Sequence, residues 1–266
     1  MSKIPEFTDI LYEVKGRAAW ITINRPKVYN AFRGRTCEEL IHAFNKAGWA
    51  DSIGVIVLTG AGEKAFSAGD DMKFEQRLAA PAERLERHFF PEHHNEKEMG
   101  YPGDDRAAMA FRRRKPVIAA VNGWCLGRGL MYLLHHSDIR IAGASAKFGF
   151  PEISFGMGGT SGLTLIQKHL PRNVALEMVL TGKPIDAKRA EAVHLINHVV
   201  PDEDVMRFAE EIAAGIAEHP ASAIRTEMES YLCTENLDHD TGLAVGEHIY
   251  RLQRLVTDVK NSDVEF

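Results

Sequence analysis

Two glycine-rich loops contain the residue types best suited to binding a negatively charged oxygen. They cover residues 65–73 and 122–129, and each follows an apolar, β-branched run. Glycine-rich turns at helix N-termini let backbone N–H groups point at a ligand, and the helix dipole favours negative charge there. Two such loops meeting at one oxygen would form an oxyanion hole. Neither loop has the Gly-x-Gly-x-x-Gly or Lys-Ser/Thr pattern of nucleotide sites, which argues against a dehydrogenase or an ATPase.

Glu152 is the candidate acid/base. It follows Phe148-Gly149-Phe150-Pro151, and this apolar context should raise the pKa of a carboxyl group and prepare it for proton transfer near neutral pH. The alternative interpretation is a carboxylate that caps a helix or a turn.

The elements expected around these residues are those of an α/β protein. Residues 10–14 and 18–24 alternate apolar and polar side chains, which predicts an antiparallel hairpin, and residues 36–48 have helical spacing. Residues 54–59 and 116–121 are continuous apolar runs, typical of strands buried in a parallel sheet. The middle of the chain is therefore expected to repeat a strand–loop–helix unit.

The segment from Glu75 to Arg114 is rich in charge and is expected to be a solvated excursion or a mobile wall of a pocket. Its histidines, His88, His93 and His94, lack the helical spacing of a metal-ligand set, so no metal site is predicted.

Three helices are predicted after residue 201, over residues 202–218, 221–233 and 236–259. The last has Leu243, Ile249, Leu252 and Val256 along one face. This apolar stripe must be buried, either on the same domain or against another subunit.

The bulk composition is that of an ordinary soluble globular protein. A chain of 266 residues suffices for one large domain, and a net charge of −5 gives no reason to expect nucleic acid or an anionic membrane as partner. Cys37, Cys125 and Cys233 are widely spaced and indicate free thiols in a reducing compartment. No signal peptide or membrane-spanning run is recognisable, so a cytoplasmic protein is expected.

Several motifs in a fixed order point to a known family. They are Asn24-Arg25-Pro26-Lys27-Val28-Tyr29-Asn30-Ala31, Val57-Leu58-Thr59-Gly60, Phe66-Ser67-Ala68-Gly69-Asp70-Asp71-Met72-Lys73, Lys115-Pro116-Val117-Ile118-Ala119-Ala120-Val121-Asn122-Gly123, Ser137-Asp138-Ile139 and Phe148-Gly149-Phe150-Pro151-Glu152-Ile153. With them, residues 8–265 resemble the crotonase (enoyl-CoA hydratase/isomerase) superfamily. The resemblance implies a spiral of ββα units over residues 1–200 and a C-terminal α-helical trimerisation region over residues 201–266. A homotrimer or homohexamer is then expected.

The resemblance also implies roles for individual residues. The N–H groups of Asp70 and Arg128 would form the oxyanion hole, and Glu152 would be the acid/base. Coenzyme A would be part of the substrate, not a separate cofactor. Its moiety would lie along Lys27, Val28, Tyr29, Ala68, Asp71 and Met72. A thioester α-proton is too weakly acidic for a carboxylate unless the enolate oxygen is stabilised, and one such donor is typically worth about 3–4 kcal/mol.

Met131 is a departure from the family, because typical hydratases have a second glutamate there. Methionine suits the lining of a pocket. The absence of the second glutamate argues against hydration by two carboxylates, one orienting water and one donating the proton. What remains is a site with one glutamate, as in isomerases or hydroxycinnamoyl-CoA hydratase-lyases. Hydration, isomerisation and hydratase-lyase chemistry on an unsaturated acyl-CoA all stay open. The Asn122-Gly123-Trp124-Cys125 stretch resembles hydroxycinnamoyl-CoA hydratase-lyases, although Trp124 would also suit the core. The N-terminal third resembles naphthoate synthases and ring-opening ketoacyl-CoA hydrolases, which implies a cyclic or aromatic acyl group. A non-catalytic acyl-CoA scaffold is the alternative from another class.

Arg128 is the second departure, since most relatives have a glycine there. A positive side chain at a helix N-terminus opposes the dipole by up to ~1 kcal/mol. It is expected either to face the pocket and favour a polar acyl group, or to pair with Asp70 or Asp71.

Overall fold

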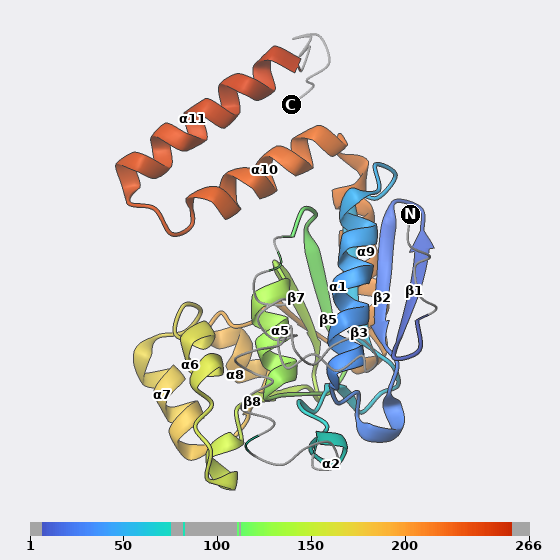
Figure 1. Ribbon diagram of the computed structural model, residues 1–266, viewed down its shortest axis with the longest axis vertical. Helices are drawn as coiled ribbons and strands as arrows, with labels where there is room; N and C mark the ends of the chain where they lie inside the picture. Colours follow the sequence, from blue (N-terminus) through green and yellow to red (C-terminus); the bar gives the residue numbers. More distant parts are fainter. Residues whose placement is uncertain (1–6, 76–81, 83–110, 112, 257–266) are drawn as a thin grey trace.

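The largest sheet has six strands in the order β1-β2-β3-β5-β7-β10 (Figure 1). The computed structural model describes residues 7–75, 82, 111 and 113–256. The strands are β1 (Ile10–Lys15), β2 (Ala18–Ile23), β3 (Val55–Gly60), β5 (Val117–Val121), β7 (Ile139–Gly143) and β10 (His198–Val200). β1 and β2 form the predicted antiparallel hairpin, and the other neighbours are parallel.

The continuous apolar runs are explained by burial on both faces of this sheet. One face of β3, with Val55 and Val57, packs on helix α9 (Val205–Glu218). The opposite face, with Ile56 and Leu58, packs in the main core together with α1 (Gly34–Trp49). Every residue of β3 and β5 is buried, which confirms the prediction of buried parallel strands.

A second sheet, with the order β4-β6-β8-β9, positions the candidate site. Its strands are β4 (Ala65–Ser67), β6 (Trp124–Leu126), β8 (Lys147–Gly149) and β9 (Ile185–Asp186). β4, β6 and β8 each come directly after a strand of the larger sheet and are parallel to one another. The residues that follow these three strands therefore leave the sheet at the same edge.

Helices follow the paired strands and complete the ββα units. They are α2 (Met72–Glu75), α5 (Arg128–His136), α6 (Thr160–Ile166), α7 (Arg172–Thr181) and α8 (Ala187–Ala192), with 3₁₀ turns at Pro26–Val28, Glu152–Phe155 and Asp202–Asp204. The expected α/β fold with repeated ββα units is confirmed.

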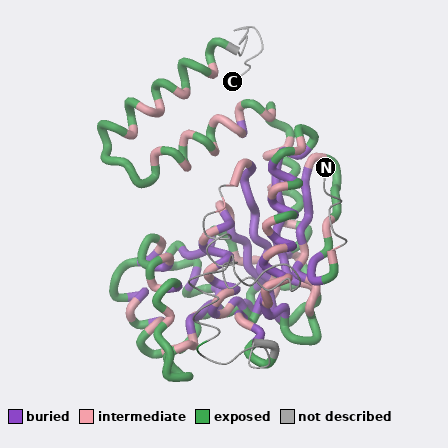
Figure 2. Tube along the Cα trace, in the orientation of Figure 1, coloured by how far each residue is buried: buried purple, intermediate pink, exposed green. Residues whose placement is uncertain are grey.

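The last two helices, α10 (Ala221–Thr234) and α11 (His239–Val256), pack on each other and project away from the sheets (Figure 1). Figure 2 shows α11 as largely exposed, whereas most of α10 is intermediate or exposed and Ile224 is buried. Leu243 is 57% exposed and Leu252 64% exposed, so the apolar stripe of α11 is not buried on the described part of its own chain. The division at residues 200 and 201 stays a prediction, and α9, which lies beyond it, covers the large sheet.

Two expectations concern absent features. Most of the charged segment, including His88, His93 and His94, lies outside the described residues. Among the described residues, no cluster of three or more side chains is suited to hold a metal ion. Within the residues that the structure describes, no helix is both long and apolar enough to cross a membrane.

Candidate active site

The site lies where the ends of β4, β6 and β8 meet. Gly69 follows β4 with φ +93°, and Gly127 follows β6 with φ +51°. A Cβ on Gly69 would lie 3.0 Å from the carbonyl oxygen of Leu126 and 3.4 Å from the backbone nitrogen of Arg128. The two glycine-rich loops are thus in backbone contact, and glycine is needed at Gly69 both for this approach and for its φ.

The N–H groups of Asp70 and Arg128 are oriented by their elements. The N–H of Phe32 donates to Gly69 (2.7 Å), and the N–H of Asp71 donates to Phe32 (2.8 Å). Successive N–H groups of an extended segment point to opposite sides, so that of Asp70 points away from Phe32. Arg128 is the first residue of α5, where N–H groups lack an acceptor within the helix. Both groups can donate to an external oxygen.

The Glu152 carboxylate lies beside this helix start. Its Oε1 is 2.9 Å from the point where a Cβ on Gly127 would lie, and its Oε2 is 3.4 Å from the corresponding point on Gly159. Oε2 is buried, and no hydrogen bond to it is made within the described part of the chain. Burial raises the pKa of Glu152, a hydrogen bond from its own backbone opposes this, and the negative charge of Asp70 raises it further. The carboxyl is therefore suited to accept a proton.

The side chain of Arg128 forms an ion pair with Asp70 on the opposite loop, through Nε and Oδ1. The Arg128 side chain is 17% exposed and that of Asp70 34%. Nη1 of Arg128 lies 4.0 Å from the sulfur of Cys37 on α1. Of the two orientations expected from the sequence, the structure therefore shows the pairing with Asp70.

Most of the residues predicted to lie along coenzyme A are exposed next to these loops. Ala68 donates its N–H to the carbonyl of Tyr29 (2.9 Å), which joins the Pro26–Val28 turn to the loop of Asp70. Val28 is 37% exposed, Tyr29 49% and Met72 48%. Lys27 and Ala68 are exposed as well. The structure thus brings Lys27, Val28, Tyr29, Ala68 and Met72 together, and their contact with coenzyme A stays a prediction.

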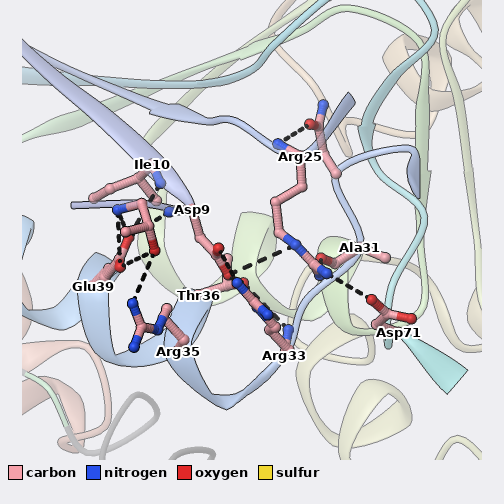
Figure 3. A network of polar contacts seen from close by, with 11 residues as sticks. Asp9, Ile10, Arg25, Ala31, Arg33, Arg35, Thr36, Glu39 and Asp71 are labelled. Carbon is pink, nitrogen blue, oxygen red and sulfur yellow. Dashed lines mark hydrogen bonds and ion pairs between the residues drawn. The ribbon is translucent and has the colours of Figure 1, made fainter. Parts of the chain in front are cut away.

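Asp71 differs from its neighbours because it is buried. Its Oδ2 accepts a hydrogen bond from Nη2 of Arg25 at 2.7 Å, as Figure 3 shows. Arg25 also donates to the carbonyl of Ala31 and lies 3.7 Å from Asp9. Asp9 accepts hydrogen bonds from Arg33 (2.6 and 2.7 Å). The carboxylate of Asp71 thus joins the loop of residues 65–73 to Arg25. Any contact of Asp71 with coenzyme A stays a prediction.

Met131 is half-buried on α5, one turn after Gly127, and packs against the core. It lies on the same helix as Arg128, as the motif predicts. Trp124 is 40% exposed, with the ammonium group of Lys147 5.8 Å from its ring centre, so it is not a core aromatic.

Sequence reasoning missed the residues that hold the site in place. Arg25 stood inside a recognised motif, but its charged partners, Asp9 and Asp71, lie outside that motif. Gly159, which contacts Glu152, belongs to the Gly158-Gly159 pair and had no assigned role. An arginine that directly follows the predicted hairpin was the available signal for the first.

Comparisons with known proteins agree with the fold. An enoyl-CoA hydratase of Bacillus anthracis has a similar structure, with a TM-score of 0.82 and 28% identity over 94% of this chain and 92% of that one. The short-chain-enoyl-CoA hydratase of Clostridium acetobutylicum is 32% identical over 244 residues, which cover 90% of this chain and 87% of the relative. The (E)-benzylidenesuccinyl-CoA hydratase of Thauera aromatica is 28% identical, covering 94% of this chain and 93% of the relative.

The fold and the site therefore define a crotonase-type enzyme. The model of the enoyl-CoA hydratase/isomerase family matches residues 13–262, and the chain belongs to this family.

Proposed function

We propose that this enzyme forms and protonates the enolate of an acyl-CoA thioester. The N–H groups of Asp70 and Arg128 donate to the thioester oxygen, and Glu152 moves the proton. The contact between the Glu152 carboxylate and the start of α5 is the observation that supports this best, since it sets the base next to the donors. A buried Oε2 without a hydrogen-bond partner in the described residues leaves that oxygen available for a substrate proton.

The reaction that we infer is hydration of an unsaturated acyl-CoA, since the relatives compared above are named hydratases. Glu152 is then the carboxylate that transfers the proton, because Met131 cannot take part in proton transfer and the carboxylate of Asp70 is paired with Arg128. The acyl-CoA is the substrate, and the exposed surface of Lys27, Val28, Tyr29, Ala68 and Met72 receives its coenzyme A portion.

Exchange of the α-protons of butyryl-CoA in D₂O tests the proposal without assuming a natural substrate. We expect exchange with the native chain and a loss of it in Glu152→Gln. A screen of crotonyl-CoA, aryl-substituted enoyl-CoAs and cyclic ketoacyl-CoAs then identifies the acyl group. Binding of butyryl-CoA without any exchange or turnover would show a scaffold in place of an enzyme.

We also propose that the enzyme is a cytoplasmic homotrimer or homohexamer in which α11 is covered by another copy. The exposed Leu243, Tyr250, Leu252 and Leu255 support this, because several large apolar side chains exposed on one helix are unfavourable in water. Light scattering at micromolar concentration tests it, and a monomer would contradict it.

A further inference from the structure

The ion pair between Arg128 and Asp70 joins the two residues whose N–H groups form the proposed oxyanion hole. Each residue has two parts with different tasks, since the backbone N–H faces the ligand while the side chain pairs across the loops. The pair is therefore a charged contact between the two loops that carry these N–H groups. Its purpose must be sought in the charge of Asp70.

A carboxylate on Asp70 is a problem for an oxyanion hole. The reaction creates negative charge on the thioester oxygen beside the N–H of Asp70, and the side chain of the same residue is already negative. Like charges in a partly buried site repel each other strongly. An uncompensated carboxylate would oppose the stabilisation by one donor of the hole, which is worth about 10²–10³-fold in turnover.

We propose that Arg128 is an electrostatic compensator for Asp70. Its guanidinium cancels the charge of the carboxylate and so lets the hole bind an enolate. The inference rests on the proposed function and deepens it. The Arg128 side chain acts through Asp70, whereas its N–H touches the substrate oxygen. Because the guanidinium of Arg128 is already paired with Asp70, its positive charge does not require a carboxylate on the acyl group.

The charges are tested separately by four proteins: the native chain, Arg128→Gln, Asp70→Asn and the double variant. The substitutions preserve size and remove charge. We expect Arg128→Gln to lower kcat on crotonyl-CoA by at least about 10-fold, because Asp70 is then uncompensated. Asp70→Asn should lose much less activity than Arg128→Gln, since the N–H of residue 70 is kept and no carboxylate remains to oppose the enolate. The double variant should recover most of the activity lost in Arg128→Gln, because no uncompensated carboxylate remains.

A purely mechanical clamp makes a different prediction. If the pair only holds the loops together, Asp70→Asn loses as much activity as Arg128→Gln, and the double variant recovers nothing. That pattern would overturn the proposal, as would an equal effect of Arg128→Gln in both backgrounds or no effect at all. Arg207→Gln removes an exposed arginine of α9 that pairs with Asp204 and Glu211, and serves as the control.

Binding provides a readout that does not depend on turnover. Acetoacetyl-CoA ionises to a stable enolate, whereas butyryl-CoA stays neutral. The ratio of their Kd values should shift against acetoacetyl-CoA by at least about 10-fold in Arg128→Gln and return in the double variant. An unchanged ratio would overturn the inference. If the native chain binds both thioesters but performs no turnover or exchange, the proposed function fails and this ratio alone decides the inference. If it binds neither, both fail.

Discussion

Asp70 and Asp71 are adjacent in sequence, yet their carboxylates enter two different charge clusters. Asp70 faces the site with Arg128 and Glu152, whereas Asp71 faces Arg25 and Asp9 on the other side of the loop. Alternation of side chains along an extended segment explains this divergence. The first cluster thus lies in the candidate site, and the second lies among Arg25, Arg33 and Asp9 (Figure 3).

The two clusters contain carboxyl groups whose pKa values shift in opposite directions. Burial acts to raise the pKa of Asp9, but hydrogen bonds from Arg33 and Thr36 and the charges of Arg33 and Arg25 outweigh it, so the pKa is lowered. Glu152 is less buried than Asp9, and its pKa is nevertheless raised by burial and by Asp70. The partner, more than burial, decides which carboxyl is structural and which is available for proton transfer.

Removal of the Glu152 carboxylate should have the largest effect. Glu152→Gln preserves the shape of the side chain and its contact with Gly127, so fold and affinity for butyryl-CoA should be retained. Turnover of crotonyl-CoA should fall by at least ~10²-fold, because a general acid/base is lost. Steady-state kinetics and calorimetric binding measure the two quantities. Unchanged turnover would move the acid/base role to another residue.

In the cluster of Asp9, Arg25, Arg33 and Asp71, loss of a charge should lower the free energy of unfolding and leave the catalytic step unaffected. Asp9→Asn leaves Arg33 and Arg25 without their common anion, and the free energy of unfolding should fall by about 2–3 kcal/mol. Because Arg33 is 28% exposed, the loss is smaller than for a fully buried pair. Denaturant unfolding measures it. Asp204→Asn, which disrupts an exposed pair, is the control and should cost under about 1 kcal/mol. An equal loss in both would contradict the ranking.

The pH dependence should separate the clusters again. Since the pKa of Glu152 is raised from 4.5, kcat/KM should rise as the carboxyl ionises at a pH above that value. Asp70→Asn removes one cause of the shift, so this acidic limb should move to lower pH. Asp9 differs, because its pKa is lowered and the pH affects the stability of the fold. Its lowered pKa gives stability that is complete above 3.8 and is lost as pH falls toward the folded-state pKa. A limb that does not move in Asp70→Asn would contradict the influence of that charge.

The sequence was sufficient for the main elements, because their patterns are local. The β1–β2 hairpin follows from alternation and the buried β3 and β5 from continuous apolar runs. Helix α1 follows from helical spacing, and α9 from an acidic first turn and a proline after its end. The resemblance brought Asp70, Arg128 and Glu152 together, and the structure places them at three neighbouring strand ends. What could not be predicted depends on side-chain direction. Packing between segments distant in sequence decides whether the side chain of Arg128 faces the pocket or Asp70. It also decides which of the two adjacent aspartates pairs with Arg25.

His136 provides the test with the smallest expected effect. It is a buried titratable side chain that lacks hydrogen-bond partners among the described residues. It is 1% exposed on α5, stacks on Phe44 with ring centres 5.2 Å apart, and neither ring nitrogen has a hydrogen-bond partner within the described residues. Burial, with the nearby His135 and Arg113, lowers the pKa of His136 well below 6.5. The unfolded chain therefore binds a proton that the folded chain does not, and stability is lost as pH falls below 6.5.

His136→Leu removes these unsatisfied polar atoms with little change in volume. We expect a gain of up to about 1 kcal/mol at pH 7, and a larger gain at pH 5, where the native chain bears the cost of keeping His136 neutral. Denaturant unfolding at the two pH values measures both. His239→Leu changes an exposed histidine and is the control, because it removes no buried polar atoms. If the gain did not grow at pH 5, His136 would bind a proton as readily in the folded protein as in the unfolded chain, which would contradict the lowered pKa.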